Sequence, residues 1–430
     1  MLTLKIEPAD ALIDVERQIT VTGAQPGAQV EISATTVRQG VRWASYAIFE
    51  ADAQGQVNVA TQDPLEGSTY DTADAMGLIW SQVPQVEGAR QLFNQSVFDA
   101  IVTNLSVSSA GQGATTTMTQ RLATEGVKRI ELDENGLVGT LFLPDGPGPH
   151  PGIMVLNGSG GGINEPRAAL YASHGYAALA LGYFKTPGRP DYISNTHLEY
   201  FLQAMQWLRA KVALKNDFLA VSGQSRGGEL ALLLGSTFRN EVSAVMAYVP
   251  SAFVHSAQNA ADPAVGREGP TWLLDGKPLR HIWENNRYAS WAPFDEGEPP
   301  YRHELAMLTA LEDKEAIEPA RIRVENINGP VVLLSATDDG SWPSSLYCQM
   351  IVDRLKAHQF PHAVEWVDVQ DAGHAILFPY VPTTQIVYSH PVSKRVSTGG
   401  GEPAANAKAD RLSWRAVLNT LNSAVKNGTQ

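Results

Sequence analysis

The chain has 430 residues, of which 43% are hydrophobic and 18% charged, and its formal net charge is −13. This composition is typical of globular proteins and excludes a largely disordered chain. The acidic balance argues against a nucleic-acid-binding protein, because phosphate contacts require a basic surface.

The sequence also bears on the compartment. It contains one cysteine, Cys348, which excludes an intrachain disulfide and favours a reducing environment. The opening "MLTLKIEPAD" lacks the pattern of a secretory signal, and the closing "KNGTQ" is not a peroxisomal address. No run of about 20 apolar residues predicts a membrane span. We therefore expect a cytoplasmic protein that does not cross a membrane.

Residues 1–125 are expected to form a smaller all-β domain. Short runs of alternating and β-branched residues, such as "QITVTG", "QVEISATTV" and "ASYAIFEAD", are separated by turn formers such as "AQPGA" and "ADAQG". No long helical period interrupts them. The pattern predicts an antiparallel, immunoglobulin-like β-sandwich.

Residues 126–430 have a different texture. After a hairpin-like pair, "KRIELDENGLVGTLFLPDG", strand-like runs such as "GIMVLNG", "FLAVSG" and "PVVLLSAT" alternate with helix-like runs such as "HLEYFLQAMQWLRAK". Near-continuous apolar strands joined by helices predict a mostly parallel, doubly wound α/β sheet. A stretch rich in Pro, Gly, Glu and Trp at about 252–327 breaks the alternation and is expected to form a lid or pocket wall.

One serine stands at a distinctive place in this pattern. The segment Gly223-Gln224-Ser225-Arg226-Gly227 matches G-x-S-x-G, between an apolar strand and a helix. This is the setting of a nucleophile elbow, where a sharp turn exposes the serine hydroxyl and small neighbours allow close packing. An ordinary turn with a capping serine is the alternative. We favour a catalytic Ser225.

A serine hydroxyl needs an adjacent base, and in this fold class the base follows the acid in the sequence. His374 lies in the loop after the last expected strand, at the sheet edge where Ser225 is expected. His358 and His362 lie at the opposite edge, and His390, in an irregular tail, is the second candidate. Position therefore favours His374 as the base.

The acid should follow the preceding strand, where "VVLLSATDDGSWP" offers Asp338 and Asp339. Its role would be to hold the imidazole tautomer and stabilise the imidazolium. We favour Asp339 and expect Asp338 to form the turn, although composition does not separate the two. Both could instead be turn residues.

Backbone amides are the expected donors to the oxyanion. One is that of Arg226, and the other lies in the glycine-rich loop after "GIMVL", at Ser159 or Gly160. The same loop lacks the spacing of a nucleotide-binding motif. The histidines are scattered and form no H-E-x-x-H, so neither a metal nor a cofactor is expected.

Several segments resemble, in the right order, the family of acyl-CoA thioesterases and bile acid-CoA:amino acid N-acyltransferases. "DTADAMGLIWSQVP" resembles its Met-Gly-Leu-x-Trp-Ser motif, and "GSGGGINEPRAALYASHGYAALALGYF" resembles its oxyanion segment. "SGQSRGGELAL", "DDGSWPS" and "DAGH" resemble its nucleophile, acid and histidine loops, and "GGEPAANAKADRLSW" its closing helix.

The resemblance implies a β-sandwich domain followed by an α/β-hydrolase domain, with Ser225, Asp339 and His374 as the triad. It implies acyl-CoA as the substrate and favours hydrolysis, because the family's transferases carry cysteine as nucleophile. Transfer to an amino acid, a carboxylesterase acting on oxygen esters and, less favoured, a non-catalytic binding protein are the alternatives.

Two further points concern partners. Lys185, Arg189 and Arg226 are candidates for contacts with CoA phosphates, although a solvated surface position is favoured for each. Assembly into a homo-oligomer is left open.

Overall fold

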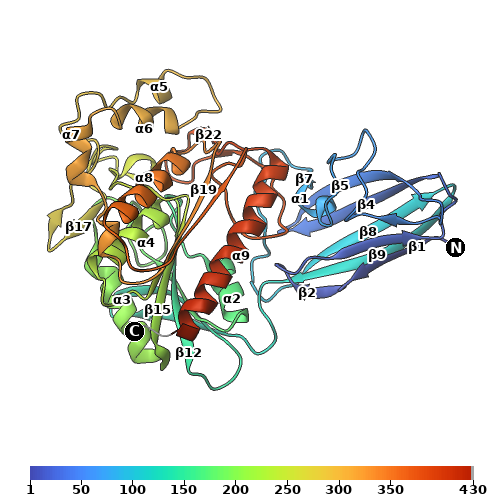
Figure 1. Ribbon diagram of the computed structural model, residues 1–430, viewed down its shortest axis with the longest axis horizontal. Helices are drawn as coiled ribbons and strands as arrows, with labels where there is room; N and C mark the ends of the chain where they lie inside the picture. Colours follow the sequence, from blue (N-terminus) through green and yellow to red (C-terminus); the bar gives the residue numbers. More distant parts are fainter. Residues whose placement is uncertain (428–430) are drawn as a thin grey trace. The chain divides into compact units, whose positions relative to one another are not determined.

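The computed structural model describes residues 1–427 (Figure 1). The chain divides into two compact units. The first comprises Met1–Thr124, Leu377–Ile386 and Glu402–Arg411, and the second comprises Glu125–Ile376, Val387–Gly401 and the residues from Leu412 onward.

The first unit contains two β-sheets. The smaller sheet has the strand order β1-β3-β6, with β1 at Thr3–Glu7, β3 at Gln18–Thr22 and β6 at Val57–Asn58. The larger has the order β2-β9-β8-β4-β5-β7, formed by Asp10–Leu12, Gln112–Arg121, Ile101–Ser109, Gln29–Arg38, Val41–Glu50 and Val83–Pro84 respectively. The expected β-sandwich is confirmed, and its neighbouring strands are antiparallel except for the pair β2–β9.

Alternating side chains build the core of this unit. In β4 and β5, every second residue is buried, as expected for strands with one face on the core. The "MGLIW" motif forms the short helix α1, Gly77–Trp80, whose residues are all buried. A Cβ on Gly77 would lie 2.3 Å from the ring of Tyr70, so the helix packs here only without a side chain.

Two segments from late in the sequence complete the first unit. The Gln120 side chain donates to the Tyr380 carbonyl at 3.0 Å, and Arg411 forms an ion pair with Asp74 at 2.6 Å. The sequence led us to expect a single boundary, between residues 1–125 and 126–430. In the structure, two later segments, Leu377–Ile386 and Glu402–Arg411, also belong to the first unit.

The second unit contains an eight-stranded sheet of order β10-β11-β13-β12-β15-β16-β19-β20. Its strands span, in that order, Lys128–Glu134, Leu137–Leu143, Ala177–Gly182, His150–Leu156, Leu214–Gln224, Ala244–Tyr248, Val331–Ala336 and Val364–Val369. The pairs β10–β11 and β11–β13 are antiparallel and the others are parallel. Every residue of β13 and β19 is buried, as a sheet covered on both faces requires. This is the expected α/β-hydrolase fold.

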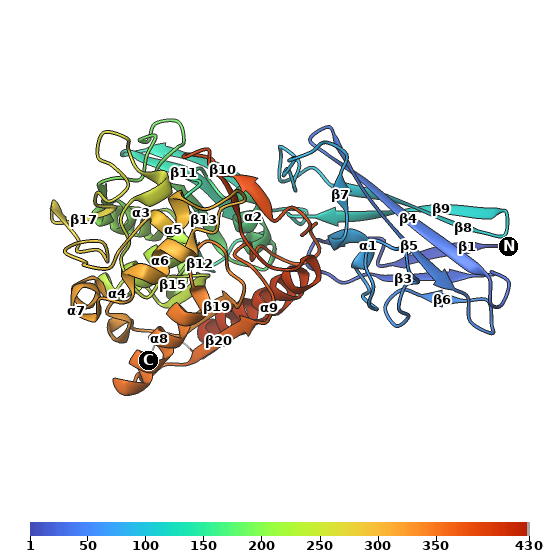
Figure 2. The same ribbon diagram turned by 90° about the horizontal axis from the view of Figure 1, so that it is seen from above.

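Helices connect and cover these strands (Figure 2). They are α2 at Glu165–Ser173, α3 at Leu198–Lys211, α4 at Arg226–Thr237, α8 at Ser344–Ala357 and α9 at Pro403–Asn427. Pro at the start of α2 and the Asn164 side chain, which accepts from the Arg167 amide, favour helix initiation there. The rings of Tyr171 in α2 and Trp414 in α9 lie 5.0 Å apart, so these two helices pack together.

The insertion between β16 and β19 is built from short elements. They are η1 at Gln258–Ala260, β17 at Trp272–Leu274, β18 at Lys277–Pro278, α5 at Ala292–Asp295, α6 at Glu304–Ala310, α7 at Lys314–Ile317, η2 at Glu318–Ala320 and η3 at Val324–Asn326. β17 also pairs with β14, Thr196–His197. After β20, the hairpin of β21, Val387–Ser389, and β22, Val396–Thr398, precedes α9.

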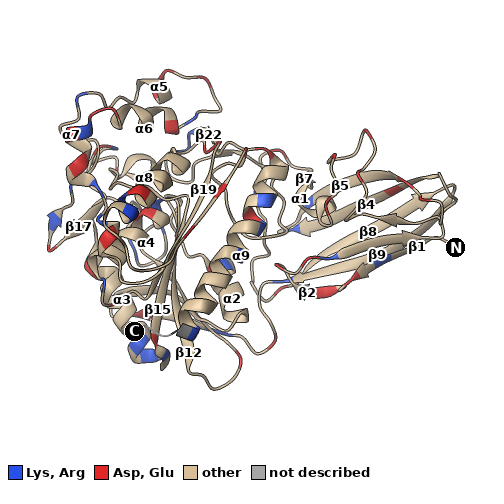
Figure 3. Cartoon of the chain, in the orientation of Figure 1, with Lys and Arg blue, Asp and Glu red and all other residues tan. Residues whose placement is uncertain are grey.

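Acidic and basic residues are interspersed along the elements of each unit, for example on α8 and α9 (Figure 3). Within residues 1–427, no helix combines the length and the apolar character needed to cross a bilayer.

Candidate active site

Ser225 lies between the end of β15 and the start of α4. Its φ of 58° and ψ of −119° are strained for a non-glycine residue, and its amide donates to the Tyr248 carbonyl at 2.8 Å. A Cβ on Gly223 would lie 1.9 Å from the Gly227 carbonyl oxygen, and one on Gly227 would lie 2.6 Å from the Asn157 oxygen. The strand, the helix and the neighbouring loop therefore approach more closely than any larger residue would permit, which is the backbone geometry expected of a nucleophile elbow.

The other two expected residues follow neighbouring strands of the same sheet. Asp339 follows β19 and His374 follows β20, so both lie at the carboxyl edge of the sheet, where Ser225 follows β15. His374 Nε2 is 2.7 Å from Ser225 Oγ, and its Nδ1 is 2.8 Å from Asp339 Oδ2. The structure brings the three side chains together in the order that proton transfer from serine to imidazole requires.

The backbone holds the acid in place. Asp339 is 4% exposed, and its Oδ1 accepts from the amides of Ser341 and Trp342 at 2.9 and 3.2 Å. Two backbone bonds keep the carboxylate turned toward His374, whose ring nitrogen it also contacts at 2.9 Å.

A glycine segment that the sequence reasoning missed supports both loops. The Gly399 carbonyl accepts from the amides of His374 and Gly340 at 2.8 and 2.9 Å. A Cβ on Gly373 would lie 2.0 Å from the Gly400 oxygen, so the segment before α9 packs closely against the loop that carries His374. The run "GGGEP" at 399–403 is the signal that indicates such a close approach.

The alternative acid has other partners. Asp338 Oδ1 accepts from Arg302 at 2.9 Å, and its Oδ2 accepts from the Gly401 amide at 2.7 Å.

The alternative histidines also lie elsewhere. His358 ends α8 and His362 precedes β20, at the edge of the sheet opposite Ser225. His390 lies in the turn of the β21–β22 hairpin, with its ring nitrogen 2.9 Å from the Ser159 hydroxyl. Of the four histidines, only His374 is bonded to Ser225 in the described residues.

The glycine-rich loop after β12 lies against Ser225. A Cβ on Gly158 would be 3.3 Å from Ser225 Cβ, and the Asn157 side chain ties the loop by donating to the Gly161 carbonyl at 2.7 Å. Within residues 1–427, the amides of Ser159, Gly160 and Arg226 have no hydrogen-bond acceptor. These are the three amides that the sequence predicted as donors to an oxyanion, and each is free to donate a hydrogen bond to it.

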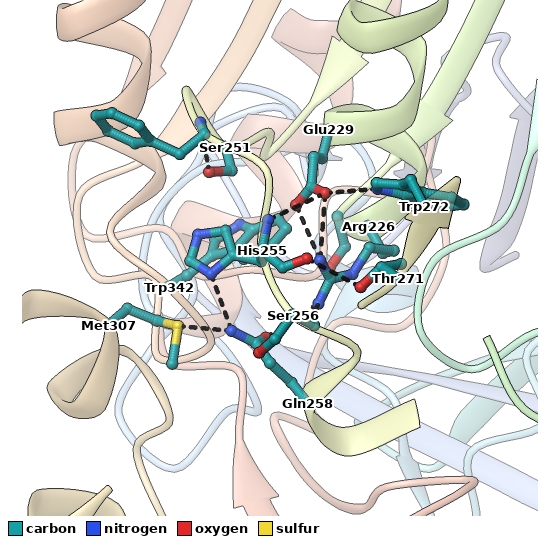
Figure 4. A network of polar contacts seen from close by, with 12 residues as sticks. Arg226, Glu229, Ser251, His255, Ser256, Gln258, Thr271, Trp272, Met307 and Trp342 are labelled. Carbon is teal, nitrogen blue, oxygen red and sulfur yellow. Dashed lines mark hydrogen bonds and ion pairs between the residues drawn. The ribbon is translucent and has the colours of Figure 1, made fainter. Parts of the chain in front are cut away.

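The Arg226 side chain contradicts the expectation of a solvated charge. It is 2% exposed, and its Nη1 pairs with Glu229 at 3.0 Å, while its Nη2 donates to the Ser256 carbonyl at 2.8 Å (Figure 4). Gln258 Oε1 accepts a further bond at 3.1 Å. The guanidinium therefore joins the start of α4 to the insertion, where it cannot contact a phosphate at the surface.

Glu229 completes this buried network. Its Oε1 also accepts from Trp272 Nε1 at 2.8 Å, and its side chain is fully buried. Burial raises the pKa of this carboxyl, and the Arg226 guanidinium opposes the change. Two elements of the insertion, η1 and β17, are thus fixed to α4, the helix that begins directly after Ser225.

Three imidazoles of the second unit, those of His255, His303 and His390, are buried. Burial lowers the pKa of His303 to about 3 and that of His390 to about 4, and it places the pKa of His255 well below its usual value. These rings are therefore neutral at physiological pH and add no positive charge beside His374. Burial also raises the pKa of the Cys348 thiol on α8, which disfavours a thiolate there.

The remaining basic candidates are half-buried. Lys185 Nζ donates to the Pro391 carbonyl, and the Arg189 guanidinium lies 3.9 Å from the centre of the Tyr200 ring. Neither forms an ion pair within the described chain. In residues 1–427, no group of three or more His, Cys, Asp and Glu side chains is arranged to hold a metal ion.

Two family descriptions match this sequence. Residues 14–134 match "Acyl-CoA thioester hydrolase/BAAT N-terminal region", and residues 196–427 match "BAAT / Acyl-CoA thioester hydrolase C terminal". The chain belongs to the acyl-CoA thioester hydrolase/BAAT family. The resemblance found in the sequence is thereby confirmed, and family and fold together make the chain an enzyme of the hydrolase type.

Mouse proteins of this family align over nearly the whole chain. Acyl-coenzyme A thioesterase 6 is 29% identical, with 96% of this chain and 95% of its own covered. Mitochondrial acyl-coenzyme A thioesterase 2 is 30% identical, with 96% and 87% covered. Among solved structures, a puromycin-hydrolyzing peptidase of Mycobacterium tuberculosis is 13% identical, with a TM-score of 0.44, 99% of this chain and 68% of that one covered.

Proposed function

We propose that the protein hydrolyses acyl-CoA thioesters through an acyl-enzyme on Ser225. The observation that carries the proposal is the chain of hydrogen bonds from Ser225 Oγ to His374 Nε2, 2.7 Å, and from His374 Nδ1 to Asp339, 2.8 Å. Membership of the acyl-CoA thioester hydrolase/BAAT family supports the choice of thioester.

The geometry supports a sequence of steps. His374 Nε2 takes the proton of Ser225 Oγ as the oxygen attacks the thioester carbonyl, and Asp339 stabilises the imidazolium. The amide of Arg226 and those of Ser159 and Gly160 donate to the oxyanion. The imidazolium then protonates the departing CoA sulfur. A water, activated by His374, hydrolyses the acyl-enzyme and releases the carboxylic acid.

The insertion is proposed to form a wall of the acyl site. Support comes from its bonds to Arg226, the residue after the nucleophile, through the Ser256 carbonyl and Gln258. We also propose a cytoplasmic location, as expected from the sequence.

The test is thiol release from acyl-CoAs of short, long and branched chains, with Ser225→Ala and Ser236→Ala compared with the wild type. Ser236 lies on the same helix and donates to the Leu233 carbonyl, so it controls for substitution in α4. We expect Ser225→Ala to lower turnover by several orders of magnitude and Ser236→Ala to keep it. Wild-type turnover by Ser225→Ala would contradict the proposal.

Two further assays distinguish the thioesterase from a transferase and from a carboxylesterase. Release that depends on added glycine or taurine, with formation of the acyl amide, would indicate a transferase. Cleavage of simple esters without cleavage of any acyl-CoA, and without competitive inhibition by free CoA, would indicate a carboxylesterase.

A further inference from the structure

The turn that carries His390 is attached to the glycine-rich loop. His390 Nε2 is 2.9 Å from Ser159 Oγ, and Lys185, which follows β13, donates to the carbonyl of Pro391. A Cβ on Gly160 would lie 3.5 Å from the Pro391 ring. The turn is also fixed in itself, because the His390 amide donates to the Arg395 carbonyl at 2.9 Å.

The partners of His390 determine its tautomer. Nδ1 accepts from the amides of Val392 and Ser393, each at 3.2 Å, so it carries no proton. The ring is 3% exposed and neutral, because burial and the ammonium groups of Lys185 and Lys394 disfavour the cation. A neutral imidazole with an unprotonated Nδ1 has its proton on Nε2. His390 therefore donates to the Ser159 hydroxyl oxygen.

This bond leaves the Ser159 proton available. A hydroxyl that accepts one hydrogen bond can still donate one, and within residues 1–427 Ser159 Oγ has no hydrogen-bond partner other than the donor His390. Ser159 follows Gly158, whose position is in contact with Ser225. A free donor thus lies in the loop beside the nucleophile, next to an amide that is also free.

We propose that the Ser159 hydroxyl is an additional donor to the oxyanion and that His390 is the residue that positions it. The inference rests on the proposed serine mechanism and extends it. His390 Nε2 fixes the oxygen, so the remaining rotation of the hydroxyl directs its proton toward the negative charge that develops on the carbonyl. A donor held in place before the reaction stabilises this charge without reorganisation.

The two ring nitrogens can be tested separately. His390→Asn supplies an acceptor near Nδ1 for the turn amides but no donor to Ser159, whereas His390→Gln extends an amide donor toward the position of Nε2. We expect Ser159→Ala and His390→Asn each to lower kcat by about 10²-fold, with KM changed by less than about threefold. His390→Gln should recover most of the loss. His358→Phe, at an exposed helix end, controls for removal of a histidine.

The double variant Ser159→Ala/His390→Asn decides whether His390 acts through Ser159. If it does, the double variant should be no slower than Ser159→Ala by more than about twofold. Losses that multiply, or His390→Asn performing better than His390→Gln, would mean that the histidine only supports the turn and would overturn the inference.

Labelling of Ser225 by a fluorophosphonate, read by intact mass, separates this inference from the proposed function. If the wild type is labelled and cleaves acyl-CoAs while Ser159→Ala has the same kcat, the inference alone fails. If the wild type is neither labelled nor active, the serine mechanism itself fails, and the inference with it.

Discussion

Asp338 and Asp339 are consecutive residues whose carboxylates have different partners. Asp339 is bonded to His374, while Asp338 forms a half-exposed ion pair with Arg302. The Asp339 carboxylate faces His374, and the Asp338 carboxylate fixes a loop. The two positions therefore provide a matched pair for testing the acid.

Asp339→Asn is expected to lower kcat by roughly 10³–10⁴-fold, because an amide in place of the carboxylate favours the wrong imidazole tautomer and cannot stabilise the imidazolium. Asp338→Asn should keep kcat within a few-fold and lower the free energy of unfolding by about 1 kcal/mol or less, since its ion pair is partly solvated. Steady-state kinetics of both variants provide the comparison. Equal losses in the two would contradict the assignment of Asp339.

At the residue scale, the sequence predicts the place of a candidate site residue where that residue directly follows a strand of the sheet. Ser225 and His374 follow from a G-x-S-x-G turn and from the loop after the last strand, because the carboxyl ends of parallel strands share one edge. The sequence did not separate Asp338 from Asp339 by spacing, since neighbouring residues of a turn point in directions that backbone bonds decide. The contact between Ser159 and His390 joins residues 231 positions apart, so no local pattern indicates it.

At the scale of elements, the elbow between β15 and α4 depends on small residues. A Cβ on Gly223 would lie 1.9 Å from a backbone oxygen that cannot move without shifting α4. Gly223→Ala should therefore lower the free energy of unfolding of the second unit by roughly 1–3 kcal/mol or more. Gly297→Ala, in an exposed part of the insertion where the nearest atom is 3.3 Å away, is the control. Chemical denaturation measures both, and equal stability of the two would refute the steric argument.

The insertion is fixed to α4 by the ion pair of Arg226 and Glu229. Glu229→Gln leaves the guanidinium without its counter-charge in a buried site, and loss of one partner of a buried pair costs about 3–5 kcal/mol. Asp217→Asn breaks the ion pair with Arg209 at a carboxylate that is 75% exposed, and should cost about 1 kcal/mol or less. Thermal denaturation compares the two variants.

Hydrogen exchange localises the effect. Because η1 and β17 are hydrogen-bonded to the side chains of this ion pair, Glu229→Gln should increase the hydrogen-exchange rate of backbone amides in residues 255–274. Unchanged exchange there would mean that the insertion is held by its apolar contacts alone. The sequence predicted an insertion of about these bounds, but not its attachment, because a charged residue beside a nucleophile is ordinarily solvated.

At the scale of the whole molecule, the two textures of the sequence correspond to two kinds of sheet. Alternation in "QVEISATTV" marks a strand with one buried face, and the continuous "PVVLLSAT" marks one buried on both faces. The return of residues 377–386 and 402–411 to the first unit was not predictable, because it depends on long-range bonds such as that of Gln120 to Tyr380.

The buried neutral histidines make stability depend on pH. His255, His303 and His390 have folded-state pKa values below the usual 6.5, so the unfolded chain binds protons at a higher pH than the folded one. Their stabilising contribution is complete above about pH 6.5 and is lost as the pH falls toward the folded values. For His303 and His390 the loss between pH 7 and pH 5 is about 2 kcal/mol each.

Glu229 and Glu304 act in the opposite direction, because burial raises the pKa of both carboxyls. The pH dependence of the free energy of unfolding of the wild type therefore combines contributions of opposite sign. A comparison of the wild type with a histidine variant separates them. His303→Gln removes one titrating ring and leaves the carboxyls in place. The difference in free energy of unfolding between pH 7 and pH 5 should then be smaller by about 2 kcal/mol than in the wild type. An unchanged difference would mean that His303 becomes protonated in the folded protein near its ordinary pKa, and hence that its site admits water.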